Sequence, residues 1–425
     1  MSEEKYLQLV RVQINRYTKQ SRNETVTFKS EDNEHFYITS GAVDCKRGRN
    51  KTRRLAFPIA EWDMRKQFYI DKGYRIVDDQ DRGVKTVVIT DGTNKPIEDP
   101  VFRTVLERFV KLNNEMITEQ YSRSVKNVAP ENLKAAQDAL LDMTSRKDTI
   151  SIQEFNSLLM NVVWTRVPRL QNQLYQKIAH GRGEFESILA REQETLDNLM
   201  QFLSCPDKVD NSESVDILTA NGITEYTVVS PEEKAMLKTL MTDQSNRFKR
   251  AWSVHNEAND KKLASYCNER GLDINSNNDV QLLFHGTGVE NIWSIMKHGL
   301  YLNPAVLKSD VRICGKAYGY GSYFAPYCYK SMAYASSVFG GGRHSSGYLL
   351  VFRVATGNPY YINRDSEPYR PRHYEDFHKK FPKCDVCWAE AGETANNAMM
   401  RLRWDEVIAY REDQSALAYI IEYTC

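Results

Sequence analysis

The chain has 425 residues, and its 57 lysine and arginine residues almost equal its 56 aspartate and glutamate residues. This balance excludes a wholly basic nucleic-acid coat protein and a strongly acidic disordered chain. The hydrophobic content of 41% indicates two or three folded domains, and eight cysteines are too few for a disulfide scaffold. No apolar run is long enough to cross a bilayer, and the first residues lack a signal-peptide core. We therefore expect no membrane partner and a nuclear or cytoplasmic location.

Residues 1–95 are predicted to form a small, mainly β domain. Apolar residues in short runs predict strands at residues 6–14, 26–29, 36–38 and 87–89, and a helix over residues 59–72. The region holds 19 Lys and Arg against 14 Asp and Glu, a net charge of +5. Six of its cations lie within nine residues: Lys46, Arg47, Arg49, Lys51, Arg53 and Arg54. Such a run suits contacts with nucleic-acid phosphates or a nuclear-import signal, and a solvated loop is the plainer interpretation.

Residues 96–205 are predicted to form an all-α helical bundle. Apolar residues recur at helical spacing over residues 102–116, 133–141, 155–163 and 185–203. Pro130 starts the second of these helices and Pro168 stops the third. The polar segment Ser204–Asp216 is typical of a linker.

Residues 216–425 combine segments of helical spacing with short apolar runs typical of strands, which predicts an α+β domain. Helices are expected over residues 232–250, 291–299 and 329–336. Short apolar runs predict strands over residues 280–284, 321–325, 348–354, 358–362, 407–411 and 418–423.

The chemistry-bearing residues of the chain lie in this last region. The sequence contains neither a phosphate-loop motif nor a dinucleotide-binding glycine motif, so ordinary P-loop and Rossmann chemistry is unsupported. Instead, a predicted buried strand ends in His285-Gly286-Thr287. A glycine there lets a ligand approach the backbone, whose N–H and C=O groups then bind an amide. Taken alone, a histidine at a strand end is more often a polar residue satisfied within the fold.

Two further segments follow. Tyr323 and Tyr334 offer two aromatic faces with the Ser331 hydroxyl between them, which suits a flat heteroaromatic amide such as nicotinamide. Glu406 opens a predicted strand near the end of the chain. Taken singly, the tyrosines are more often part of a hydrophobic core, and a glutamate at the end of a strand is usually solvated.

In combination and in this order, these segments resemble the ADP-ribosyltransferase domain of the poly(ADP-ribose) polymerase family. His285, Tyr323 and Glu406 match the family's His-Tyr-Glu triad in its motifs L-x-H-G-[ST], G-x-G-x-Y-F-A and E-x-[IV]-x-Y. Residues 330–334 match its K-S-x-x-Y helix start, and Asn291 matches an asparagine near the adenosine end of the substrate.

The resemblance extends upstream to the DNA-damage-dependent branch of the family. Residues 96–205 look like its helical regulatory domain, and residues 216–425 look like its catalytic domain. Residues 1–95 look like a WGR domain, a DNA-sensing module, in which Ser40-Gly41-Ala42-Val43 stands at the defining W-G-R. Two basic residues that the family often has near its substrate are replaced here by Tyr301 and Tyr320, and Val407 replaces the aromatic residue after the glutamate.

The resemblance implies a transferase that takes ADP-ribose from NAD, releases nicotinamide and modifies protein acceptors, itself included. It also implies damaged DNA as a partner and no requirement for a metal. Glu406 would stabilise the oxocarbenium-like transition state and polarise the acceptor, with His285 and Tyr323 completing the catalytic set. Its implied NAD-binding residues are His285, Gly286, Thr287, Asn291, Tyr323, Ser331 and Tyr334. Polymer formation is the expected outcome; a single-unit transferase and a DNA-binding scaffold with a silent transferase domain are the alternatives.

One competing pattern concerns metal. The spacing of His373, His378, Cys384 and Cys387 is acceptable to a four-ligand zinc ion. A single C-x-x-C is weak support without a second pair, and ordinary reduced thiols are the simpler interpretation.

Overall fold

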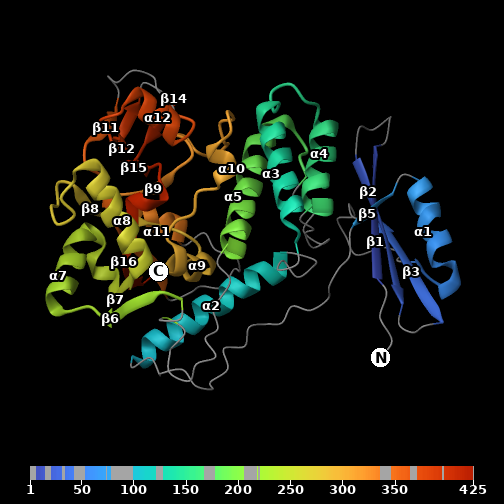
Figure 1. Cartoon of the computed structure of the whole chain (residues 1–425), viewed down its shortest axis with the longest axis horizontal. Helices are drawn as coiled ribbons and strands as arrows, with labels where there is room; N and C mark the ends of the chain where they lie inside the picture. Colours follow the sequence, from blue (N-terminus) through green and yellow to red (C-terminus); the bar gives the residue numbers. More distant parts are fainter. Residues whose placement is uncertain are drawn as a thin grey trace. The chain divides into compact units, whose positions relative to one another are not determined.

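The protein is described by a computed structural model (Figure 1) that covers residues 6–14, 21–30, 34–42, 53–72, 74–77, 99–120, 128–166, 178–204, 218, 221–335, 346–363, 371–394 and 397–424. The chain forms two compact units, each discontinuous in sequence. The first combines Met1–Thr86 with Ile117–Leu196, and the second combines Val87–Met116 with Asp197–Cys425.

The first unit contains an antiparallel sheet of five strands in the order β4-β3-β2-β1-β5. Alternate residues of the long strands point to one face, where Phe28 and Phe36 stack at 5.4 Å and contact Trp62 of a covering helix. The elements are β1 (Tyr6–Ile14), β2 (Ser21–Ser30), β3 (His35–Ala42), β4 (Arg53–Pro58), α1 (Trp62–Asp71) and β5 (Arg75–Val77). The strands predicted before residue 40 and the helix are thereby confirmed, and residues 87–89 lie outside the described residues.

Of the basic run, Arg53 and Arg54 lie in β4, where they pair with Ser40 and Thr39 of β3. Lys46, Arg47, Arg49 and Lys51 lie outside the described residues.

Helices complete the first unit: α3 (Pro130–Ser145), α4 (Ile152–Met160), a π-helical turn (Asn161–Arg166) and most of α5 (Phe185–Ser204). Ser151 caps α4 by accepting from the Glu154 N–H at 3.1 Å. Phe155 of α4 stacks on Phe185 of α5 with ring centroids 3.9 Å apart. These helices confirm the periodicity-based predictions for residues 133–141, 155–163 and 185–203.

The first of the four predicted helices, α2 (Pro100–Gln120), packs elsewhere. Its apolar stripe lies in the core of the second unit, where Phe102 contacts Trp252 at 5.3 Å and Phe109 contacts Tyr348 at 4.9 Å. Just before α2, Asp99 accepts a hydrogen bond from the Trp252 indole at 2.9 Å. The amphipathic pattern therefore predicted the helix but not the core that it completes.

The second unit is built on two sheets. The larger sheet is antiparallel with the order β6-β7-β16-β10-β8, and the smaller has the order β11-β12-β15-β9. The larger consists of β6 (Ile223–Val228), β7 (Phe248–Asn256), β8 (Val280–His285), β10 (Gly347–Ala355) and β16 (Ser415–Tyr423). The smaller consists of β9 (Ser322–Phe324), β11 (Pro359–Ile362), β12 (Val386–Ala389) and β15 (Glu406–Ala409). A separate hairpin pairs β13 (Gly392–Thr394) with β14 (Asn397–Leu402).

Helices cover both faces of the larger sheet, because its strands are apolar on both sides. Leu350 and Phe352 of β10 face a core shared with α2 and α9, whereas Leu349 and Val351 face a core shared with α7 and α11. The helices of this unit are α7 (Pro231–Leu240), α8 (Glu257–Arg270), α9 (Ile292–His298), α10 (Pro304–Leu307), α11 (Cys328–Ala335) and α12 (Tyr374–Lys380). The expected α+β fold is confirmed for this region.

One predicted boundary is wrong. The helix expected over residues 232–250 ends at Leu240, and Phe248–Asn256 form strand β7. Thr242 adopts a positive φ of 51°, which no α-helix tolerates, and the next residues form a 3-10 turn. Ala251 and Trp252 are then buried between β6 and β16, so packing in the sheet decides the structure.

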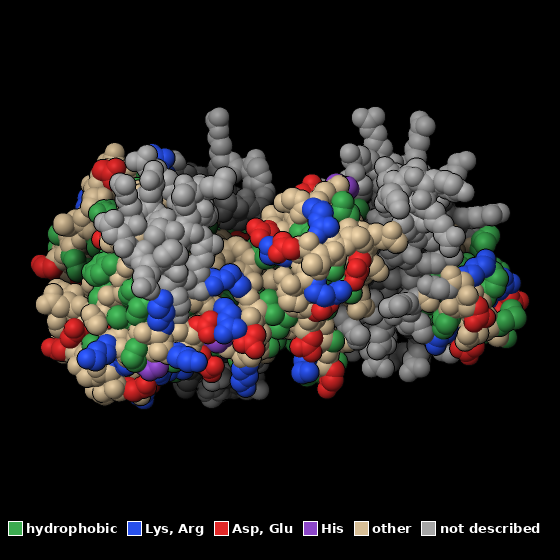
Figure 2. Space-filling view, turned by 90° about the horizontal axis from the view of Figure 1, so that it is seen from above, with side chains coloured by type: hydrophobic (Ala, Val, Ile, Leu, Met, Phe, Trp, Pro, Cys, Tyr) green, Lys and Arg blue, Asp and Glu red, His purple; other side chains and the backbone are tan. Residues whose placement is uncertain are grey.

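The described surface carries charges of both signs. Figure 2 shows Lys and Arg side chains interspersed with Asp and Glu side chains on the face in view, in keeping with the overall charge balance. Among the helices of the described ranges, none is long and apolar enough to cross a membrane.

Candidate active site

The two sheets of the second unit meet at one point, and the candidate triad lies there. Phe284 of β8 and Ala325, just after β9, form a bridge with two N–H···O bonds of 2.9 Å. His285 is the last residue of β8, and Tyr323 is the middle residue of β9. Glu406 opens β15, whose next residue, Val407, pairs with Phe324 of β9. Strand pairing thus brings together three residues that lie far apart in sequence.

His285 is held in its neutral form. Its Nδ1 lies 2.9 Å from the carbonyl oxygen of Tyr323, and since a carbonyl can only accept, Nδ1 carries the proton. Burial lowers the pKa of His285 to about 4, and the nearby charge of Lys316 acts in the same direction. At neutral pH, Nε2 is therefore a hydrogen-bond acceptor, which is the form that a sugar hydroxyl needs.

Tyr323 offers its ring, because its hydroxyl is already occupied. The hydroxyl donates to the Gly319 carbonyl at 2.8 Å and accepts from the Tyr318 N–H at 3.0 Å. Burial raises the pKa of this hydroxyl well above its usual value, so it stays protonated. The Lys316 ammonium lies 5.1 Å from the centroid of the ring.

Glu406 forms an ion pair with Lys330 of α11. The exposed fractions of the two side chains are 13% for Glu406 and 14% for Lys330, so the pair is largely shielded from water. The sequence pattern marked Lys330 only as part of a helix start and gave it no role. Nothing in the local sequence indicated a role for it, because its partner Glu406 lies 76 residues away in the chain.

Gly286 and Ser331 make a close backbone contact between β8 and α11. A Cβ atom at Gly286 would lie 2.7 Å from the carbonyl carbon of Ser331 and 2.8 Å from its Cα, closer than a side-chain carbon can approach. Ser331 is buried, with 3% of its surface exposed. Glycine is therefore required at position 286 for the backbone to approach this serine so closely.

The remaining predicted residues lie around this point. Asn291 donates from Nδ2 to Thr287 Oγ1 at 3.1 Å, so these two side chains form one polar unit after β8. Tyr334, one turn beyond Ser331 on α11, has 58% of its surface exposed, whereas Tyr323 is half-buried. The stacking of a ligand between these two tyrosines stays a prediction.

The two tyrosines that replace basic residues differ in environment. Tyr320 is 2% exposed; its hydroxyl donates to Asp197 Oδ2 at 2.8 Å and accepts from the Asn303 N–H at 2.9 Å. Tyr320 therefore joins the loop before β9 to the end of α5. Burial raises the pKa of the Tyr301 hydroxyl to about 12.

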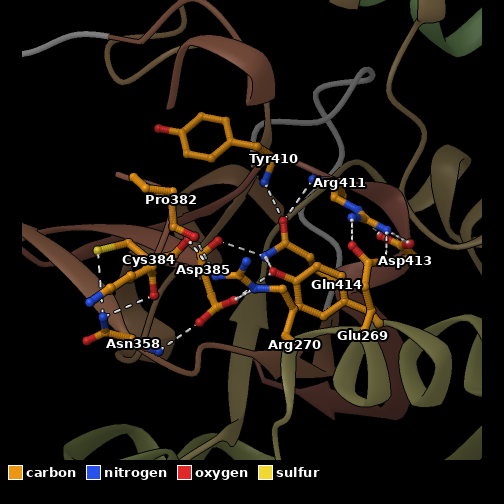
Figure 3. A network of polar contacts seen from close by, with 12 residues as sticks. Glu269, Arg270, Asn358, Pro382, Cys384, Asp385, Tyr410, Arg411, Asp413 and Gln414 are labelled. Atoms are coloured by element: carbon orange, nitrogen blue, oxygen red, sulfur yellow. Dashed lines mark hydrogen bonds and ion pairs between the residues drawn. The ribbon is translucent and has the colours of Figure 1, made fainter. Parts of the chain in front are cut away.

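A buried polar network links α8 to the residue before β12 and to the turn after β15 (Figure 3). The Asp385 carboxylate accepts from the Tyr266 hydroxyl at 3.0 Å, from Arg270 Nε at 2.7 Å and from the Asn358 N–H at 3.0 Å. Gln414, which is fully buried, donates both to the Tyr266 hydroxyl and to the Asp385 carbonyl. The polar side chains of this cluster thus satisfy one another, as a buried network requires for rigidity.

The same network reaches the triad through Tyr410. The Gln414 side-chain oxygen accepts from the Tyr410 and Arg411 N–H groups, each at 2.9 Å, which fixes the turn after β15. The Tyr410 hydroxyl donates to the Tyr318 carbonyl at 2.6 Å, and the Tyr318 N–H bonds the Tyr323 hydroxyl. The orientation of Tyr323 is thereby tied to the buried cluster.

The zinc alternative finds no support in the geometry. Within the part of the chain that the structure describes, no group of three or more His, Cys, Asp or Glu side chains has the arrangement of a metal site. His373 donates from Nε2 to the Ser309 carbonyl at 3.1 Å, and Cys384 accepts from Asn358 at 3.8 Å. Burial raises the pKa of the Cys387 thiol, which opposes the thiolate form that zinc binds.

Comparison with known proteins agrees with this geometry. Residues 224–425 match the model of the poly(ADP-ribose) polymerase catalytic domain. A poly [ADP-ribose] polymerase-like protein, 100L of Invertebrate iridescent virus 6, is 31% identical over 144 residues, which cover 34% of this chain and 71% of the viral protein. Protein 101L of the same virus is 24% identical over 182 residues, or 43% of this chain and 73% of that protein. The chain belongs to the poly(ADP-ribose) polymerase family and carries its ADP-ribosyltransferase catalytic domain, whose substrate is NAD.

Proposed function

We propose that the protein builds poly(ADP-ribose) on protein acceptors, itself included. The observation that carries this proposal is the position of Glu406, at the head of a strand beside Tyr323 and paired with Lys330. A carboxylate at that point serves two steps. It stabilises the positive charge that develops on the ribose, and it polarises the hydroxyl of the acceptor.

The other residues position the substrate. The backbone of Gly286 and the hydroxyl of Ser331 hold the nicotinamide carboxamide, and Tyr323 presents its ring to the nicotinamide plane. His285, neutral and oriented by the Tyr323 carbonyl, accepts a hydrogen bond from a sugar hydroxyl. When the glycosidic bond breaks, its electron pair leaves with nicotinamide, and the acceptor oxygen bonds to the ribose carbon as it loses its proton.

The test uses the full chain with labelled NAD and separates the alternatives by product size. Wild-type protein is expected to give a ladder of slowly migrating automodified species. Glu406→Gln keeps the size of the side chain and removes its charge, so we expect a folded protein that loses the ladder and about 10²–10³ in rate. A ladder of wild-type length from this variant would refute the role of Glu406. A single shifted band from the wild type would indicate single-unit transfer, and no NAD consumption would indicate a silent domain.

We further propose that damaged DNA stimulates the reaction in the nucleus through the first 95 residues. The basic run Lys46–Arg54, part of which lies on β4, supports this proposal. Interactions with phosphates are largely independent of sequence and weaken as salt rises. The logarithm of the DNA-binding constant falls linearly with the logarithm of the salt concentration. Neutralising Arg47, Arg49, Arg53 and Arg54 together is expected to reduce the magnitude of this slope by about 0.9 for each phosphate that the variant no longer neutralises. Basal NAD turnover should persist, and unchanged DNA affinity would contradict the proposal.

We also propose that the helices over residues 96–205 restrain NAD access until DNA binds. A complete deletion is a poor test, because Phe102 and Phe109 of α2 belong to the catalytic core. Phe155→Ala is sharper: it removes the 3.9 Å stack with Phe185 and loosens the bundle by about 3–5 kcal/mol while leaving α2 intact. We expect higher NAD turnover without DNA. A folded variant with unchanged turnover would count against a regulatory role.

A further inference from the structure

Lys316 is a cation at the triad that the mechanism does not use. It lies in the segment between α10 and β9, and its ammonium group is 5.1 Å from the centroid of the Tyr323 ring. Its positive charge also acts on His285, where it opposes protonation. One half-buried lysine therefore faces two of the three triad residues.

Two other cations of the second unit are already paired with carboxylates. Lys330 pairs with Glu406, and Arg372 pairs with Asp310 and Asp376. Lys316, in contrast, has no carboxylate within ion-pair distance among the residues that the structure describes. Its contact with the Tyr323 ring is a cation–π interaction, which is weaker than a charge-assisted hydrogen bond and is readily exchanged for one. The side chain is thus available to an anion that enters the site.

NAD supplies an anion at a suitable place. If its nicotinamide lies against Gly286, Ser331 and the Tyr323 ring, the diphosphate follows one ribose further along the molecule. Tyr301 and Tyr320, which flank the same stretch of chain, carry no positive charge, and the Tyr320 hydroxyl is buried and bonded to Asp197. A lysine on a flexible four-carbon stem is well suited to reach across this distance as a point charge.

We propose that Lys316 binds the diphosphate of NAD. This inference rests on the proposed placement of nicotinamide at Gly286, Ser331 and Tyr323. On binding, the ammonium exchanges the Tyr323 ring for phosphate oxygens, which leaves that ring to the nicotinamide.

The test compares Lys316→Met with Lys316→Arg and with Lys308→Met. Lys308 is an exposed lysine upstream in the same segment and serves as the matched control. Binding of ADP-ribose and of nicotinamide is measured separately by calorimetry. Lys316→Met should weaken ADP-ribose binding by about 10- to 100-fold and should not weaken nicotinamide binding, because only the former carries a diphosphate. Lys316→Arg should restore most of the affinity, and Lys308→Met should have no effect.

Kinetics and NMR provide independent readouts. In NAD turnover, Lys316→Met should raise KM and leave kcat nearly unchanged, the signature of a binding interaction that is equal in ground and transition states. The pKa of His285 should rise in the same variant, since a positive charge is removed from its surroundings. Unchanged ADP-ribose affinity, or an equal loss of nicotinamide affinity, would overturn the inference. A wild type that binds ADP-ribose through Lys316 yet does not consume NAD would instead refute the proposed function.

Discussion

The close approach of Gly286 to Ser331 allows a sharp test of the site, because it depends on the absence of a single methyl group. In Gly286→Ala, the new Cβ would overlap the Ser331 carbonyl oxygen and would lie 2.7 Å from the carbonyl carbon, whereas ordinary van der Waals separation begins at 3.4 Å. Relief of the contact with the carbon requires 0.7 Å, the difference between these distances, and relief of the contact with the oxygen requires more. The clashing atoms are backbone atoms of α11, so no side-chain rotation can provide it.

This displacement acts directly on the chemistry. Moving α11 away from β8 shifts Ser331, to which the proposed function assigns the nicotinamide carboxamide, and Lys330, which pairs with Glu406. Misplacement by about 1 Å typically costs on the order of 10²-fold in rate, and overpacking costs about 1–3 kcal/mol of stability. We therefore expect Gly286→Ala to remain folded, to lose about 10²-fold in NAD turnover and to bind nicotinamide weakly.

Gly288 provides the matched control two residues away. A Cβ there would meet only the carboxylate end of Glu290, a flexible side chain that can move aside. Gly288→Ala should therefore keep turnover within a few-fold of the wild type. The assay is release of nicotinamide from NAD, accompanied by thermal denaturation of each variant. If Gly286→Ala is as active as Gly288→Ala, the close approach of β8 and α11 does not form the site.

Three further predictions concern the same region. Burial and Lys316 lower the pKa of His285 to about 4, so the unfolded chain takes up its proton first as pH falls; stability should drop by up to about 3 kcal/mol between pH 6.5 and 4. Urea denaturation across this range should show a smaller drop in His285→Gln, and an identical profile would refute the assignment. Tyr320→Phe leaves Asp197 Oδ2 without its buried donor and should cost about 1–3 kcal/mol in thermal denaturation; an unchanged melting temperature would contradict this. Lys330→Met frees the Glu406 carboxylate and should lower kcat about tenfold with little change in KM, whereas a change confined to KM would show that Lys330 only binds substrate.

The sequence was most informative where function restricts residue type. His285, Tyr323 and Glu406 were predicted from motif order, and strand pairing accounts for their proximity. Lys330 and Lys316 were not given roles, because a lysine becomes informative only when its neighbours are known. Those neighbours, Glu406 and Tyr323, are contributed by strands distant in sequence, and no local pattern reveals such proximity.

Secondary structure was likewise predictable where the local pattern decides it and not where tertiary packing does. Helices with a clear apolar stripe, such as α3 and α5, were predicted from periodicity. The error at residues 241–250 arose where helix-compatible residues are drawn into a sheet by packing against β16. Likewise, the apolar face of α2 predicts a buried helix and carries no information about which core buries it.

The position of β16 has a consequence for how the catalytic unit assembles. This strand, Ser415–Tyr423, lies between β7 and β10 in the middle of the larger sheet, although it follows both by a long stretch of chain. During synthesis, β6–β7 and β8–β10 therefore exist as separate strand pairs with exposed inner edges until residues 415–423 emerge. Unpaired strand edges of this kind promote association with other chains. Because β16 pairs with strands that lie far away in the sequence, the sheet has a high contact order, which is typical of slow folding. A truncated chain without β16 accordingly lacks the strand that joins the β6–β7 pair to the β10–β8 pair, so the larger sheet that carries His285 is split in two.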